Sequence, residues 1–344
     1  MRNTSKSFIN ENNHTQNIQD LISEIKNEHK NLNAKQLATY DIKLDLKDEA
    51  TGKSIYDIEN PYERVLKYRE DFSKLGMNFE ADAALRSMVL FTELFPYVNY
   101  DGRAIELQRY DEEGDPYKYN KARLKFQIGN INDHEFVYRG DVMNSYAGTI
   151  NAYRRMFGDE LPEEAMELLK LVHTIGNFAP VPFARNDEEF NRPRGYNNPK
   201  INDYWDLTLL AIYNWFLKKN GKTPIYELDL MDVVKTEAGV RMCEKWLSSF
   251  KDENGNYSWD EFVKQNYMES FVEFENELPW EECLGSYGMP KELWNGHFET
   301  FENIPRPETK EQFLQFFDNA KKWIEHRGYK MAKKVVRNST RKKA

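Results

Sequence analysis

Long apolar runs, cysteines and glycine-rich phosphate-binding motifs are all scarce in this 344-residue chain. No run approaches the roughly 20 apolar residues that a membrane-spanning helix needs, so no membrane partner is expected. The first 20 residues are polar and have no apolar core, so no secretory signal is expected. The two cysteines, Cys243 and Cys283, are too few for a disulfide framework or a zinc site, which favours the reducing cytoplasm.

Motifs of well-known chemistries are also missing. The chain has no Walker A loop, no dinucleotide-binding glycine pattern, no G-x-S-x-G elbow and no H-E-x-x-H zinc motif. The stretch from Asp252 resembles a calcium loop, but Tyr257 stands where glycine is needed and Val263 where the bidentate glutamate is needed. Cys283 has no neighbouring histidine, so a thiol nucleophile is not indicated. The cofactor, if there is one, stays unknown.

The composition describes a folded but acidic protein. Forty per cent apolar residues and 14% aromatic residues exclude disorder for most of the chain. The net charge of −9 is uneven, because residues 330–344 hold seven basic side chains and no acidic one. That leaves 41 basic against 57 acidic residues in the remainder. Such a body does not attract a phosphate backbone, whereas the basic tail either attracts one or is a solvated terminus.

Hydrophobic periodicity predicts a mainly α-helical fold with a small antiparallel β-sheet insert, an α+β protein. We expect one helical domain over 36–329 around a central polar loop, after a polar lead-in (1–35) and before the basic tail (330–344). The insert near 98–140 is expected to hold strands at 104–110, 122–128 and 135–139. Helices are expected at 18–25, 61–75, 80–95, 142–157, 162–174, 204–219, 226–230, 236–250, 259–276 and 310–334.

The central loop within 173–209 is the most unusual stretch, since it concentrates His, Asn, Arg, Pro and Gly between two helices. His173 is expected near the end of a helix that Gly176 terminates, where it either stabilises the last carbonyls or acts as an acid or base. Asn177 is expected to hold the loop through its own amide. Pro180 and Pro182 force an extended segment that is either a wall for polar groups or a connector.

Arginines of the same loop form a cationic cluster within an acidic protein. Their planar guanidinium groups match phosphate or carboxylate, so an anion site is one interpretation and internal salt bridges are the other. Asp203 is expected to cap the following helix, and Asp206, one turn in, is expected to pair with Arg194 or His173.

A second polar cluster, R-G-D-V-M-N-S-Y, covers Arg139 to Tyr146 at a strand-to-helix junction. We expect Asp141 to cap the helix, with Asn144 and Ser145 outward near its first turn, where exposed N–H groups could hold an anion. The alternative is a capped helix start without a ligand.

These two blocks resemble an uncharacterised family of bacterial proteins, in R-G-D-V-M-N-S and in H-T-I-G-N-F-A-P-V-P, F-N-R-P-R-G and D-Y-W-D-L-T-L. That family has no assigned chemistry, so the resemblance lends no catalytic residue. The G-N-F-x-x-V-P portion is faintly similar to a segment of modification-dependent restriction enzymes, whose D-H-[IL] motif is D-H-E here. In general character the chain resembles abortive-infection proteins of the lactococcal type.

Three functions follow as expectations, and the sequence does not decide whether the protein is an enzyme. The first is phage resistance of the abortive-infection type, with a His/Arg/Asp cleft that acts on nucleic acid or a nucleotide. The others are a non-enzymatic interaction protein with a structural loop and a hydrolase of a small phosphorylated substrate. The predicted catalytic residues are His173 and Asp206. The predicted anion-binding residues are Arg139, Asn144, Ser145, Asn177, Asn191, Arg192 and Arg194, without a metal.

Overall fold

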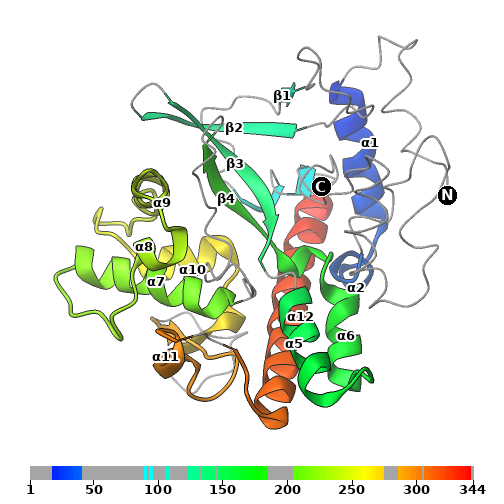
Figure 1. The fold of residues 1–344 in the computed structure, drawn as a ribbon. Helices are drawn as coiled ribbons and strands as arrows, with labels where there is room; N and C mark the ends of the chain where they lie inside the picture. The colour runs from blue at the N-terminus through cyan, green and yellow to red at the C-terminus, as the bar shows by residue number, and fades with distance from the viewer. Residues whose placement is uncertain are drawn as a thin grey trace, which may run out of the picture.

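The fold was analysed in a computed structural model, which describes residues 18–40, 89–90, 93–95, 106–108, 123–131, 134–143, 146–184, 204–274, 286–303 and 306–341. It confirms the expected class, because helices surround a small antiparallel sheet (Figure 1). The central segment 185–203 and the expected helix at 61–75 lie outside the described residues. The expected helix at 80–95 is described as helical at 89–90 and 93–94.

The described chain contains helices and strands in successive groups. The helices are α1 (Ile18–Asn31), α2 (Ala34–Ala38), α5 (Ala147–Phe157), α6 (Glu163–Leu171), α7 (Trp205–Lys219), α8 (Leu230–Val234), α9 (Glu237–Leu247), α10 (Trp259–Asn266), α11 (His297–Thr300) and α12 (Lys310–Arg341), with 3-10 turns η7 (Ile175–Asn177) and η8 (Glu269–Phe271). The strands are β1 (Glu106–Gln108), β2 (Arg123–Ile131), β3 (His134–Val142), β4 (Phe178–Ala184), β5 (Val272–Phe274) and β6 (Tyr287–Pro290).

The main sheet has the antiparallel order β1-β2-β3-β4. The first three strands are the predicted ones, whereas β4 is the segment that sequence reasoning described only as extended. Pro180 lies opposite Gly140 and Pro182 opposite Tyr138. Amide groups point alternately to the two sides of a strand, so prolines two residues apart remove donors from one side only. This is why an edge strand such as β4 tolerates them.

Helix α12 is the central support of the fold. It runs past α5 and α6 and also contacts α1, α2, η7 and η8 (Figure 1). Its buried face carries Phe313, Phe316 and Phe317, which meet Tyr153 of α5 and Tyr146 edge-on. Aromatic pairs of this geometry stabilise a core beyond the area they bury.

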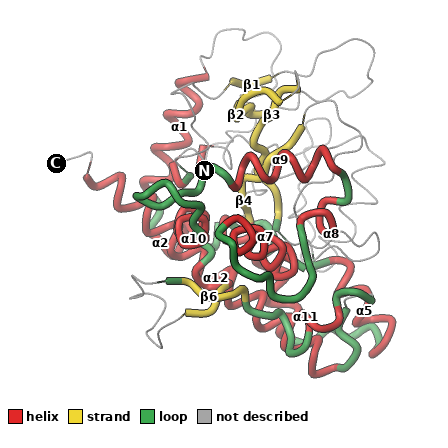
Figure 2. The backbone as a smooth tube through the Cα atoms, turned by 90° about the vertical axis from the view of Figure 1, so that its left-hand side faces the viewer, coloured by secondary structure: helices red, strands yellow, loops and turns green. Residues whose placement is uncertain are grey.

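A second aromatic cluster joins α7, α9 and α10, with α7 and α10 next to each other (Figure 2). Trp246 of α9 packs edge-on against Phe262 of α10, and Trp259 stacks on the same ring. The helix ends here follow local chemistry: Thr236 caps α9 through its side-chain oxygen, and Asn220 with Gly221 (φ +71°) ends α7 as predicted.

Three predicted boundaries are wrong. Helix α5 begins at Ala147, not near Val142, because β3 stays paired with β4 up to Val142. Tyr226 lies in a turn with φ 49°, and the helix there is α8, capped by Asp229. Helix α10 ends at Asn266, because Tyr267 adopts the left-handed conformation (φ 57°) and the chain continues into η8 and β5.

The basic C-terminal segment also differs from the expectation. Helix α12 continues without a break to Arg341, seven residues past the predicted end at Lys334. Met331, Ala332 and Val335 are buried. The residues from Lys330 to Arg341 are therefore part of a helix that Met331, Ala332 and Val335 anchor to the core. A separate solvated tail does not begin at Lys330.

Candidate functional site

The most unusual polar group of the core is Asp206, in the first turn of α7. The other side chains that this helix buries are apolar except for Thr208 and Asn214, and Asp206 is 1% exposed. One carboxylate oxygen, Oδ2, accepts a hydrogen bond from the Leu293 N–H (2.9 Å) and contacts Nδ1 of His297 at 2.6 Å. A buried carboxylate needs such partners, because an unpaired charge in the core is costly. Asp206 and His297 therefore form a buried acid–histidine pair.

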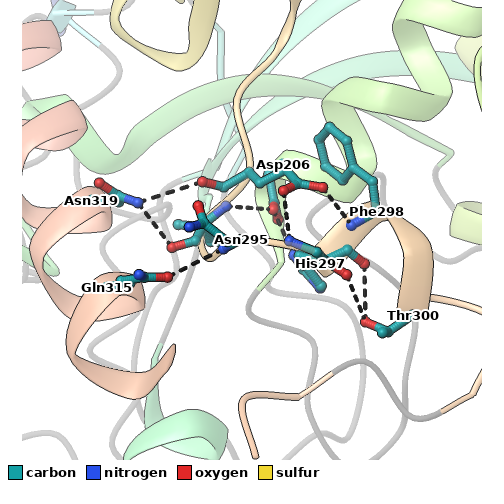
Figure 3. Close-up of polar contacts among 10 residues, drawn as sticks. Asp206, Asn295, His297, Phe298, Thr300, Gln315 and Asn319 are labelled. Atoms are coloured by element: carbon teal, nitrogen blue, oxygen red, sulfur yellow. Dashed lines mark hydrogen bonds and ion pairs between the residues drawn. The ribbon is translucent and has the colours of Figure 1, made fainter. Parts of the chain in front are cut away.

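The loop that delivers His297 is held from several sides (Figure 3). The two carboxylate oxygens of Glu292 accept hydrogen bonds from the Gly296 and Phe298 N–H groups, at 2.8 and 2.9 Å. Asn319 of α12 donates to the Leu293 carbonyl at 3.0 Å, and Gln315 accepts from the Asn295 N–H at 3.2 Å. These contacts tie the start of α11 to α12, so the imidazole position is fixed by the scaffold.

Aromatic rings enclose the imidazole. Trp294 stacks on His297 with ring centroids 3.5 Å apart and an interplanar angle of 22°. Tyr204, the residue before α7, meets the imidazole edge-on at 4.8 Å. His297 has no exposed surface. The stacked indole and the edge of Tyr204 therefore hold the imidazole ring in one orientation.

Three buried polar atoms at this site lack a hydrogen-bond partner among the described residues. Among the described residues, no hydrogen-bond partner contacts Nε2 of His297, Oδ1 of Asp206 or Oγ1 of Thr208, all of which are buried. Ionised Asp206 can only accept, so Nδ1 of His297 carries the proton and Nε2 presents a lone pair. A buried acceptor without a donor costs about 1–3 kcal/mol. The arrangement places a ring nitrogen without a partner among the described residues opposite the one that contacts the carboxylate, which is the geometry that a general base requires.

In the part of the chain that the structure describes, no three His, Cys, Asp or Glu residues gather as a group that could hold a metal ion. Cys243 of α9 is buried, and burial raises the pKa of its thiol well above the usual range. This thiol is therefore a core group and not a nucleophile at neutral pH.

The first predicted catalytic residue, His173, lies in the turn between α6 and η7, where it is half-buried. Asp206, the second, pairs with His297 and not with His173, while the expected pairing with Arg194 is not tested by the described residues. Arg194 lies outside the described residues, as do Asn144, Ser145, Asn191 and Arg192. Arg139 lies in β3 opposite Val181.

The expectation for Asp141 is also wrong. It belongs to β3, opposite Ala179, and cannot cap α5, which starts at Ala147 after Tyr146 (φ 59°) without any side-chain cap. The strand pairing takes the backbone groups that the cap would have used. No helix begins at Asp141, so the anion site that was expected at such a helix start is not formed there.

The H-T-I-G-N-F block has a structural explanation. Gly176 does not end α6, which stops at Leu171; it lies in η7 against α12. A Cβ atom at Gly176 would come within 2.1 Å of the Ile324 carbonyl oxygen. Asn177 is fully buried and donates to the Val172 carbonyl at 2.8 Å, while its own carbonyl accepts from the Met143 N–H at 2.7 Å. The amide of Asn177 thus holds the turn, as predicted from sequence.

Arg327 of α12 completes this anchor. Its guanidinium is buried, and Nη1 donates to the Gly176 and Phe178 carbonyls at 2.7 Å each. Nε donates to the Asn266 carbonyl at 3.1 Å. One cation therefore satisfies carbonyls from η7, β4 and the end of α10, and these charge-assisted hydrogen bonds help to offset the cost of burying it.

The comparison with known proteins assigns a family but no chemistry. The chain matches a family of unknown function, DUF6994, over residues 112–331, and it belongs to that family. No curated protein and no solved structure matches it. None of the described helices is both long and apolar enough to cross a membrane. The match includes the sheet, Asp206, His297 and most of α12.

Sequence reasoning missed His297 altogether. The residue is 91 positions from Asp206, outside every element that periodicity predicts, and it belongs to no motif of known spacing. The available signal was Asp206 itself: an acid within an apolar helix requires a polar partner from elsewhere in the chain. Only the fold identifies which of the six histidines supplies it.

Proposed function

We propose that the protein is an acid–base enzyme in which Asp206 and His297 act on a phosphorylated substrate of the nucleotide or nucleic-acid class. The single observation that carries the proposal is the uncommitted Nε2 of His297, next to a carboxylate that fixes the opposite ring nitrogen. The buried acceptor then has a use that offsets its cost.

The chemistry is hydrolysis of a phosphate ester. Nε2 of His297 takes a proton from water as the water oxygen forms a bond to phosphorus. Asp206 stabilises the imidazolium that results. The bond from phosphorus to the leaving oxygen breaks, that oxygen keeps the electron pair, and the imidazolium returns the proton to it. Water is the only co-reactant, and no redox step is needed.

The phosphorylated class of substrate is supported by the sequence that leads into α7. Arg185, Arg192 and Arg194 precede Tyr204 in a chain whose net charge is −9. Guanidinium groups are the side chains best suited to phosphate oxygens. The burial of His297 adds a requirement, since a substrate must displace neighbouring groups to reach Nε2. We therefore expect ligand binding to change hydrogen exchange at residues 293–298.

The test is a turnover assay with matched variants. Purified wild-type protein is incubated with ribonucleotides, deoxyribonucleotides and oligonucleotides, and phosphate or shortened products are measured. His297→Gln retains a neutral polar side chain, and Asp206→Asn retains the shape of the carboxylate. General-base catalysis is typically worth about 10²–10⁴-fold, so both variants should lose at least a hundredfold in kcat. Turnover by His297→Gln at the wild-type rate would refute the assignment.

A second candidate is a non-enzymatic interaction protein in which the pair only braces the fold. It is favoured by the complete burial of both side chains and by the Leu293 hydrogen bond. In that case His297→Gln and Asp206→Asn lower the melting temperature, and no substrate from the panel is turned over by the wild type.

The biological role that we propose is phage resistance, supported by the general likeness to abortive-infection proteins. Its test is the efficiency of plating on cells that express wild-type protein or His297→Gln at equal levels. Protection by the wild type that is lost in the variant supports the role. Equal plating on cells with and without the wild-type protein contradicts it.

A further inference from the structure

The last turns of α12 present an uneven distribution of charge. No acidic residue follows Glu325, while Lys330, Lys333, Lys334, Arg337 and Arg341 all fall on this part of the helix. At 100° per residue these five positions lie within an arc of about 100°. The buried residues Met331, Ala332 and Val335 lie on the opposite side of the helix. We call the five basic positions, together with Tyr329, the basic face.

The lysines of the basic face differ in their local partners. Lys330 pairs with the buried Glu269, but within the described part of the chain Lys333 and Lys334 form no ion pair with a carboxylate. The Lys333 ammonium lies 4.3 Å from the centroid of the Tyr329 ring. Tyr329 is itself 39% exposed, one of few large apolar side chains at the surface. The basic face therefore combines Lys333 and Lys334, which have no carboxylate partner among the described residues, with an exposed aromatic ring.

We propose that the basic face of α12 binds the phosphate backbone of a nucleic acid. From Lys330 to Arg341 the helix rises by about 16 Å, so a single phosphate group would meet only one or two of the cations. A row of this length matches a polyanion with regularly spaced charges. Tyr329 adds a surface on which a base can stack. The inference does not depend on chemistry at Asp206 and His297.

An anionic membrane is a less suitable partner. Helices that lie on membranes insert an apolar face into the acyl region. The apolar face of this part of α12 is occupied, because Met331, Ala332 and Val335 pack against the protein. The acidic remainder of the chain repels any polyanion, which limits the contact to the basic face.

The experiment measures binding by fluorescence anisotropy across a salt series. The probes are a labelled RNA single strand and a labelled DNA duplex, each of about 20 nucleotides or base pairs. Wild-type protein is compared with Lys333→Gln/Lys334→Gln. Each lost phosphate contact should reduce the slope of log K against log salt by about 0.9 on the duplex, so the double variant should be shallower by about 1.8. The two probes show whether RNA or DNA is preferred.

The control is Lys222→Gln/Lys251→Gln, which removes the same charge from exposed lysines of other elements. It should bind with the wild-type slope, and both variants should keep the wild-type melting temperature. Three results would overturn the proposal. They are an absence of binding to either probe at about 50 mM salt, equal slopes in all three proteins, and capture by phosphatidylserine vesicles but not by either oligonucleotide.

Discussion

Replacing Arg327 with methionine should strongly destabilise the protein, although the residue is far from Asp206 in sequence. The guanidinium donates three hydrogen bonds of 3.1 Å or less, to the carbonyls of Asn266, Gly176 and Phe178. Hydrogen bonds to a charged group contribute about 1.5–3 kcal/mol each. Part of this sum offsets the cost of burying the cation, so the net loss should be about 3–5 kcal/mol.

The assay is urea unfolding followed by circular dichroism, with the change in midpoint converted through an unchanged m-value. Arg327→Lys keeps the charge but reaches fewer carbonyls, so it should lie between wild type and Arg327→Met. The control is Arg241→Met, which removes an arginine that is half exposed and pairs with Glu237 on the same helix. That change should cost less than about 0.5 kcal/mol. A loss below about 1 kcal/mol for Arg327→Met would refute the anchor.

Three further predictions follow from buried groups. Gly176→Ala should lower the free energy of unfolding by about 1–3 kcal/mol or more through overpacking, as measured by urea unfolding. Gly328→Ala, whose added Cβ would meet Gly176 at 3.3 Å, should be far milder. Equal losses in the two variants would contradict this packing. Burial raises the pKa of Glu269, and the contact with Lys330 offsets only part of that rise. The stability that Glu269 contributes, relative to Glu269→Gln, should therefore be greatest below the usual glutamate pKa and should decline as pH rises through the folded pKa. A contribution that grows with pH would be inconsistent with the raised pKa. In a Cys283→Ser background, Cys243 should react with a thiol reagent only as the protein unfolds, and prompt reaction of the native protein would show that the thiol is accessible.

The parts of the fold that the sequence predicts are those with local causes. Helix α1 and strands β2 and β3 follow from periodicity, and α9 follows from periodicity and the Thr236 cap. Helix α10 is predicted too long, because its stop is Tyr267 in a left-handed conformation instead of a glycine. Strand β4 is not predicted as a strand, because its two prolines are compatible only with an edge position that the sequence does not reveal.

In the candidate site, too, the sequence indicates the residues with a local signal but not their distant partners. Asp206 stands out in the sequence as an acid in an apolar helix, and Asn177 as a turn residue that uses its amide. Their partners, however, come from distant segments: His297 lies 91 residues from Asp206, and Arg327 lies 151 residues from Gly176. Such pairs depend on how α7, η7 and α12 pack together, and packing of elements has no local signature in the chain.

The position of the proton on the His297 ring shows directly whether Nε2 can act as a base. With ¹⁵N-labelled histidine, and with His297→Gln used to assign the signal, the two ring nitrogens are distinguished by their shifts and couplings. The account predicts a proton on Nδ1, a bare Nε2, and a change at Nε2 when a hydrolysable phosphorylated ligand is added. A proton on Nε2 with Nδ1 bare, or an Nε2 signal indifferent to every such ligand, would contradict it.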